Sequence, residues 1–183
     1  FMVGEFSELQ GIMGREYALL AGEKPEVAHA IYEHYLPIVA GGDLPQTDEG
    51  AIVGIADKID TIVGFFAVGM PPSGTADPYA LRRQALGVIN IILARRYPLS
   101  LDFLIDESLT SLKDVLKKPA GDIKKDVLDF FKGRLQNQLI AQGYAYDTVD
   151  AVLSTDIGDL VPLIEKIQAL QAFRQNPEFE PIS

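Results

Sequence analysis

Histidine and cysteine, which often bind metal ions or act as nucleophiles, are scarce in this sequence. It contains two histidines, His29 and His34, and no cysteine. Five residues apart on a helix, the two rings would point about 140° away from each other around the axis, so they cannot bind one ion as an i, i+4 pair does. The lack of cysteine excludes disulfides, thiolate zinc sites and cysteine nucleophiles. The sequence therefore predicts no metal ligand, and each histidine is interpreted as structural.

Two aspartates, Asp57 and Asp60, lie in the segment AIVGIADKIDTIVG. On a helical wheel Asp60 is close to the apolar stripe, Asp57 is at its edge and Lys58 is opposite. A carboxylate near a buried face needs a partner, because an unpaired charge is costly to desolvate. Metal binding or the ordering of RNA-binding side chains is one interpretation, and a structural ion pair or capping contact is the favoured one. Nucleophile-elbow and glycine-rich phosphate-loop motifs are absent, so no catalytic residue is predicted.

Basic residues are concentrated in residues 113–134, where seven lysines and arginines stand against four aspartates. Residues 147–165 hold five acidic residues and no basic one. A region polarised in this way could turn one face to a phosphate backbone. An ordinary solvated helix face is the equal alternative.

Two adjacent arginines, Arg82 and Arg83, follow the loop PPSGTADP. Arginine at this place could grip a phosphate in bidentate fashion. It could equally pair with Asp57 or Asp60 and fix the loop, and the sequence leaves both possibilities open.

The composition describes a folded and strongly acidic chain. Hydrophobic residues make up 48% of the 183 residues, which is enough for a core, and the formal net charge is −10. That charge argues against a general nucleic-acid coat protein but leaves room for a local basic face. No apolar run of 18 residues lacks a charge, so no membrane span is predicted. No secretory leader is visible, and the expected location is the cytoplasm.

Apolar periodicity and capping residues predict an all-α fold. Helices are expected over residues 7–22, 25–36, 52–66, 78–96, 100–116, 123–141, 147–153 and 159–170. Asp77 is expected to cap the fourth helix, with Pro78 as its first residue. The segment YPLS at residues 97–100 is the predicted boundary between two helical groups, 1–97 and 98–183. The third helix has the clearest apolar stripe, formed by Ile52, Ile55, Ala56, Ile59, Ile62, Val63 and Phe66.

Several stretches also resemble a known family. The runs EFSELQGIMG, ADKIDTIVG and PSGTADPYALRRQALG are similar to the beta subunit of the bacterial two-subunit glycyl-tRNA synthetase. The run FFKGRLQNQLIAQGYAYDTVDAVLS, residues 130–154, resembles the helical anticodon-binding-like region that ends the same subunit. The chain is therefore expected to be an internal-to-C-terminal fragment of such a subunit.

The resemblance implies a fold and a function. Residues 1–97 would form a degenerate HD-like helical domain, and residues 98–183 a helical anticodon-binding-like (DALR-like) domain. The fragment would bind glycine-specific tRNA without catalysing a reaction and without a cofactor of its own. The whole enzyme would use ATP and Mg²⁺, with adenylate chemistry in the alpha subunit, in a tetramer of two alpha and two beta chains. The expected tRNA contacts are Lys58, Arg82, Arg83, Lys117, Lys118, Lys124, Lys125, Lys132 and Arg134.

Two alternatives accompany this hypothesis. One is a metal-dependent HD-type phosphohydrolase acting on a nucleotide, with Asp57 at the position of the family's last metal-binding aspartate. The His-Asp step that such enzymes also need is not found in this sequence. The other is a structural helical module that docks the beta subunit onto its partner, which an exposed apolar patch would favour.

Overall fold

A computed structural model describes residues 2–74, 77–155 and 157–174. Over these residues the fold is all-α, as predicted, with no strand beyond an isolated bridge between Ser100 and Asp159. None of the helices in these ranges has the length and apolarity that crossing a membrane requires. The helices, with 3₁₀ turns at Ser7–Leu9 and Lys113–Val115, are α1 (Met2–Glu5), α2 (Ile12–Leu20), α3 (Pro25–Glu33), α4 (Asp48–Ala67), α5 (Leu81–Arg95), α6 (Leu101–Ser111), α7 (Ala120–Ala141), α8 (Tyr146–Leu153) and α9 (Leu160–Arg174).

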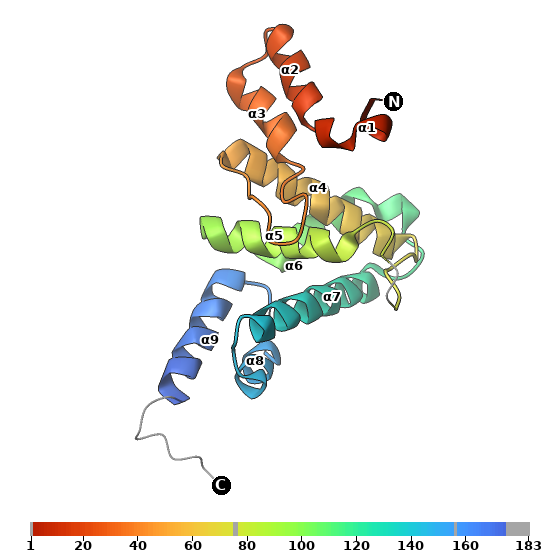
Figure 1. Ribbon diagram of the computed structural model, residues 1–183. Coiled ribbons are helices and arrows are strands. Elements are labelled where there is room, and N and C mark those ends of the chain that lie inside the picture. Colours follow the sequence, from red (N-terminus) through yellow and green to blue (C-terminus); the bar gives the residue numbers. More distant parts are fainter. Residues whose placement is uncertain (1, 75–76, 156, 175–183) are drawn as a thin grey trace.

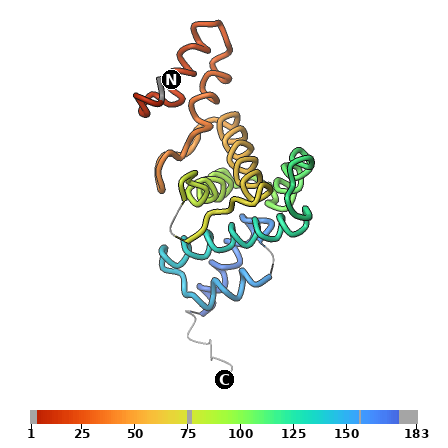
Figure 2. The backbone as a smooth tube through the Cα atoms, turned by 90° about the vertical axis from the view of Figure 1, so that its right-hand side faces the viewer, coloured from red at the N-terminus to blue at the C-terminus, as the bar shows by residue number. Residues whose placement is uncertain are grey.

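The helices follow one another from one end of the molecule to the other (Figure 1). The α2–α3 hairpin forms one end, and α8 with α9 forms the opposite end, an arrangement that the view in Figure 2 also shows. Between them α4 is the central helix, because α3 and α5 pack on it as well as α6 and α7.

One hydrophobic core runs from α4 to α9. It contains Ile59 of α4 and Ile92 of α5 together with Phe131 of α7 and Ile167 of α9, all nearly or fully buried. The predicted boundary at residues 97–100 falls in the connection between α5 and α6, and this core continues across it. The division into regions 1–97 and 98–183 stays a prediction.

The buried face of α4 differs from the predicted stripe. Ile52 is 56% exposed and Ala56 is also exposed, whereas the other five apolar residues of the stripe are buried as expected. Lys58, which the helical wheel placed opposite the stripe, is only 4% exposed, and Asp57 and Asp60 are exposed. The wheel was wrong here because it assumes one buried face, whereas α4 is covered on two sides.

The start of α5 also differs from its prediction. The helix begins at Leu81 rather than Pro78, after Ala80 in the left-handed conformation at φ 54°. The Asp77 carboxylate nevertheless accepts hydrogen bonds from the backbone N–H groups of Leu81 (2.8 Å) and Arg82 (2.9 Å). Asp77 lies before the helix and accepts hydrogen bonds from two N–H groups of its first turn, which have no partner within the helix. It therefore stabilises the start of α5 as a capping residue would.

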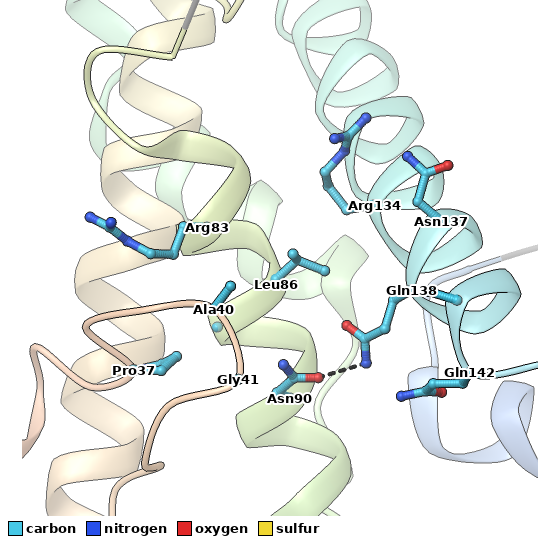
Figure 3. Close-up of a pocket in the computed structure, with 12 residues that line it drawn as sticks. Pro37, Ala40, Gly41, Arg83, Leu86, Asn90, Arg134, Asn137, Gln138 and Gln142 are labelled. Atoms are coloured by element: carbon cyan, nitrogen blue, oxygen red, sulfur yellow. Dashed lines mark hydrogen bonds between the residues drawn. The ribbon is translucent and has the colours of Figure 1, made fainter. Parts of the chain in front are cut away.

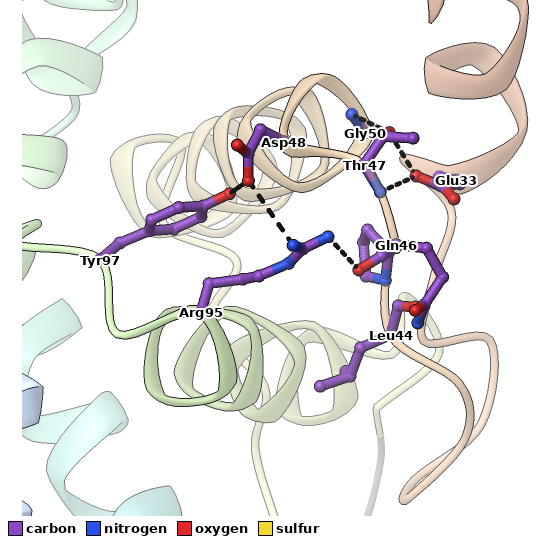
Figure 4. Close-up of polar contacts among 9 residues, drawn as sticks. Glu33, Leu44, Gln46, Thr47, Asp48, Gly50, Arg95 and Tyr97 are labelled. Atoms are coloured by element: carbon purple, nitrogen blue, oxygen red, sulfur yellow. Dashed lines mark hydrogen bonds and ion pairs between the residues drawn. The ribbon is translucent and has the colours of Figure 1, made fainter.

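Glu33 joins the end of α3 to the start of α4 (Figure 4). Its Oε2 accepts hydrogen bonds from the Thr47 hydroxyl (2.5 Å) and the Thr47 N–H (2.9 Å), while Thr47 Oγ1 accepts from the Gly50 N–H (3.0 Å). A Cβ on Gly50 would lie 2.4 Å from Glu33 Oε2, so only glycine fits there. Thr47 therefore caps α4 in a geometry that the Glu33 carboxylate holds.

The start of α4 is also tied to the end of α5 (Figure 4). The Tyr97 hydroxyl donates to Asp48 Oδ1 at 2.5 Å, and Arg95 Nη2 donates to the Pro45 carbonyl at 3.0 Å. Burial and the Asp48 carboxylate raise the pKa of Tyr97 to about 12. These contacts thus hold the connection before α4 to both α3 and α5.

Replacing the carboxylate of Glu33 should make the fold less stable at neutral pH. Burial acts to raise the pKa of Glu33, but the hydrogen bonds from Thr47 and Gln46 and the charge of His29 outweigh it, so the pKa is lowered. A lowered pKa gives stability above the unfolded value, which is lost as the pH falls through the folded value. We expect Glu33→Gln to reduce the free energy of unfolding by about 1–3 kcal/mol at pH 7, and by less below pH 4, in urea denaturation.

The matched control is Glu107→Gln, because Glu107 lies exposed on α6. The free energy of unfolding of this control variant should equal that of the unmodified chain over the same pH range. A Glu33→Gln variant that matched the Glu107 control at pH 7 would contradict the role given to this contact.

Candidate nucleic-acid interface

A groove of about 490 Å³ lies between α5, α7 and the connection that follows α3 (Figure 3). Two arginines and four side-chain amides share its lining with apolar and glycine residues. The full lining is Pro37, Ala40, Gly41, Arg83, Leu86, Gly87, Asn90, Arg134, Asn137, Gln138, Ala141 and Gln142. No carboxylate is among these residues, although the chain carries a net charge of −10.

This composition suits an anionic ligand that also carries hydrogen-bonding edges. Arginine presents a planar fork of donors that fits phosphate oxygens. A side-chain amide offers both a donor and an acceptor, the two functions with which proteins contact nucleobase edges. No carboxylate in this lining offsets the charge of the two arginines, although Arg83 also borders a second hollow that Asp57 lines.

The two arginines flank the groove from different helices. Arg83 is exposed on the first turn of α5 and extends to the side away from α7 (Figure 3). Arg134 lies on α7 with its guanidinium carbon 5.9 Å from the centre of the Phe130 ring. Its Nε is buried and has no hydrogen-bond partner in the described structure. The ring contact holds the Arg134 side chain against α7.

A hydrogen bond across the groove floor joins α5 to α7. Gln138 Nε2 donates to Asn90 Oδ1 at 2.8 Å, and Figure 3 shows the two amides reaching toward each other. The groove wall opposite α7 depends on Gly87, because a Cβ there would lie 3.1 Å from Pro37 Cδ. The small residue therefore lets the connection after α3 approach α5 closely enough to form that wall.

Lys58 is buried and its amine is engaged within the fold, and its contact with tRNA stays a prediction. Its amine donates to the His34 carbonyl at 2.6 Å, at the end of α3, and lies 3.4 Å from the Gly54 carbonyl. Burial lowers the pKa of Lys58 to about 8, against the opposing effect of the Asp57 charge. The buried amine serves the structure, because it satisfies a terminal carbonyl of α3 from the next helix.

The neighbouring candidates have structural contacts. Arg82 Nη2 donates to the Gly74 carbonyl at 2.7 Å, so this arginine holds the loop before α5 through a backbone carbonyl rather than through Asp57 or Asp60. Asp60 Oδ1 accepts from Ser108 Oγ of α6 at 3.2 Å. Asp57 lines a second hollow of about 250 Å³, in which Lys58 and Arg83 also take part.

Two lysines of the lysine-rich region pair with nearby carboxylates. Lys118 pairs with Asp126, and the Lys124 amine lies 2.9 Å from Asp102 and 2.8 Å from Asp106. The hydrogen bonds to the two aspartates of α6 raise the pKa of Lys124.

The remaining lysines of the predicted set do not reach the groove. Lys125 and Lys132 line a shallow hollow of about 320 Å³ in which Asp129 also takes part, and Lys117 is exposed after the second 3₁₀ turn. Of the nine predicted contacts, the structure thus brings only Arg83 and Arg134 together at the groove.

The amide side chains of the groove were missed by sequence reasoning. Asn137, Gln138 and Gln142 follow Arg134 at spacings of three, four and eight residues, which place them on one face of α7. The buried face of the helix carries Phe131, which belongs to the core. The polar stripe on α7 could have been found from this spacing, but Asn90 could not.

The described residues contain no group of three or more His, Asp or Glu side chains that could hold a metal ion. Divalent magnesium is bound through carboxylate and other oxygen ligands. Asp57 and Asp60 belong to no such group, so the donor set around them does not fit a Mg²⁺ site.

The fold and the groove define an all-α module that offers a cationic, amide-lined surface. A family model described as glycyl-tRNA synthetase beta subunit matches residues 1–154. The chain belongs to this family, as its sequence runs predicted.

Curated relatives are similar over the whole chain. Glycine–tRNA ligase beta subunits of Syntrophus aciditrophicus, Geobacter metallireducens and Syntrophotalea carbinolica are 65%, 57% and 56% identical to it over 182 residues. Each match covers 100% of this chain and 26% of the relative. The chain thus spans about a quarter of the length of the relatives it matches.

The buried amine of Lys58 should make stability depend on pH in the alkaline range. Between pH 8 and the ordinary lysine value of 10.5, the unfolded chain holds a proton that the folded chain does not. The free energy of unfolding should therefore rise with pH, by about 3 kcal/mol in total. We expect Lys58→Met to remove this rise in urea denaturation between pH 7.5 and 10.5.

Lys166→Met is the control, because Lys166 is exposed on α9. This variant should keep the rise seen in the unmodified chain. If the free energy of unfolding depended on pH equally in the two variants, the Lys58 amine would not be the source of the rise.

Proposed function

We propose that this chain is an RNA-binding part of a glycine–tRNA ligase beta subunit and contacts glycine-specific tRNA. In the whole enzyme, ATP and Mg²⁺ serve the attachment of glycine to tRNA, with the adenylate chemistry in the alpha subunit. The chain contributes recognition and no catalytic group to that reaction. Its place is the cytoplasm, in a tetramer of two alpha and two beta chains.

The acid-free groove carries this proposal. Within a chain of net charge −10, it combines Arg83 and Arg134 with four amides and no carboxylate. An acidic surface elsewhere weakens association with polyanions in general, which favours binding at a groove whose lining holds cations and no carboxylate. Family membership supplies the ligand that this chemistry fits, a folded RNA read through phosphates and unstacked bases.

The division into an HD-like region, 1–97, and an anticodon-binding-like region, 98–183, remains part of the proposal. Arg83 comes from the first region and Arg134 from the second, and both line one groove. We therefore infer that the two regions bind one RNA together. Lys117, Lys125 and Lys132 are retained as secondary phosphate contacts, whereas Lys118 and Lys124 contribute less because carboxylates already pair with them.

Removing the groove arginines should weaken tRNA binding. We expect Arg83→Ala and Arg134→Ala each to lower the affinity for glycine-specific tRNA about tenfold at 0.1 M salt. Each should also reduce the slope of log K against log salt by about one, because one phosphate contact is lost. Fluorescence anisotropy titrations at several salt concentrations measure both quantities.

Lys24→Ala makes the same change of charge in the turn between α2 and α3, away from the groove. It should leave affinity and slope close to those of the unmodified chain. Thermal unfolding of each variant separates loss of contact from loss of fold. Arginine variants that fold normally and bind tRNA as the Lys24 control does would refute the proposed interface.

A second role, docking to the alpha subunit, is favoured by exposed apolar side chains at the α2–α3 end. Leu20 is 83% exposed, and Tyr17 of α2 and Val27 of α3 are also exposed. Exposed apolar groups at one end of a protein are typical of contact surfaces. We expect Leu20→Asp to weaken association with the family's alpha subunit in sedimentation velocity while tRNA affinity stays unchanged. Unaltered association would place the contact elsewhere.

A further inference from the structure

The amide pair on the groove floor has hydrogen-bonding capacity left over. The bond between them uses Asn90 Oδ1 and one N–H of Gln138. An amide side chain carries both a carbonyl oxygen and an NH₂ group. The pair therefore retains the Asn90 NH₂ group as a donor and the Gln138 carbonyl as an acceptor. A neighbouring donor and acceptor match the edge of a nucleobase, which also presents donors and acceptors side by side.

The groove admits only a ligand that can enter a recess. Asn90 and Gln138 are half-buried, and their hydrogen bond is part-buried. The volume of about 490 Å³ is within the range of sites that enclose a small molecule. In an intact A-form duplex the major groove is too deep and narrow for side chains to read, and the minor groove presents its base edges on a shallow surface that does not enter a recess. A base that is unpaired and turned outward can enter.

Two arginines line the same groove as the amide pair. Arg134 and Arg83 flank the amides on different sides (Figure 3). Arg83 and Pro37 also line the second hollow of about 250 Å³, where Tyr35 and Gln84 add an aromatic ring and an amide. The two hollows therefore share one wall, and Arg83 stands between them.

We propose that the groove binds an unpaired nucleotide of single-stranded RNA, with the base edge on Asn90 and Gln138 and the flanking phosphates at Arg134 and Arg83. The adjoining nucleotide binds in the second hollow, which lies on the other side of Arg83. This inference rests on the proposed function and adds to it the form of RNA that the site recognises, single-stranded rather than duplex.

The test compares single-stranded and duplex RNA on the intact chain. Anisotropy titrations use a labelled 12-nucleotide RNA of mixed sequence, alone and annealed to its complement, beside glycine-specific tRNA. We expect the single strand to bind at least tenfold more tightly than the duplex. Asn90→Ala and Gln138→Ala should each weaken single-strand binding about three- to tenfold with no change in salt slope, because neither removes a charge.

The controls separate a lost contact from a lost fold. Gln168→Ala removes an exposed amide of α9 outside the groove and should bind as the unmodified chain does. Gln138→Glu loses the N–H that donates to Asn90 Oδ1, but its carboxylate can accept from Asn90 Nδ2 once that amide turns over. Because it also puts a negative charge in the groove, it should fold normally and lose single-strand binding more than tenfold. Melting temperatures are measured for every variant.

Two outcomes would overturn the inference. One is duplex RNA binding as tightly as the single strand, and the other is single-strand binding that Gln138→Glu leaves unchanged. If tRNA binding still depended on Arg83 and Arg134 in either case, the proposed function would stand and only the single-strand inference would fall. A chain that bound no RNA at all would remove both.

Discussion

The close packing of α3 and α5 against α4, around the buried amine of Lys58, is the constraint on which the candidate site depends. The amine holds the His34 carbonyl, and a Cβ on Gly54 would lie 3.1 Å from that same carbonyl oxygen. Gly87 of α5 lies against both Pro37 and the Lys58 chain. These contacts fix the connection after α3 on α5 and thereby form one wall of the groove. The other wall is α7, which the shared hydrophobic core holds beside α4 and α5.

The pairing of charged residues, more than their number, decides where the surface can attract an anion. The lysine-rich stretch before and within α7 has an excess of basic residues. Lys118, just before α7, nevertheless pairs with Asp126 of that helix, and Lys124 pairs with Asp102 and Asp106 of α6. Exposed pairs of this kind add little stability but reduce the local potential. The groove has only two arginines and is the stronger anion-binding candidate, because no acidic residue lines it. In an acidic chain, location of uncompensated charge matters more than total charge.

The groove also gives a reason to regard the two predicted regions as one binding unit. It lies where α5 of the first region meets α7 of the second, and the core and the family match both continue past residue 97. A ligand in the groove would contact both regions at once. A rotation between them would break the Asn90–Gln138 bond and separate the two arginines.

The sequence by itself determined the helical class, the approximate course of the helices, the role of Asp77 at the start of α5, and the family. These depend on local spacing, capping residues and sequence runs, which one segment carries alone. Arg83 and Arg134 could be named as candidates, but their meeting in one groove, the burial of Lys58 and the pairing of Lys124 with Asp102 could not. Periodicity reports how residues are arranged around a single helix axis. Packing around a common core decides which helices cover a given face. It also decides which charged residues, tens of positions apart in the sequence, come into contact.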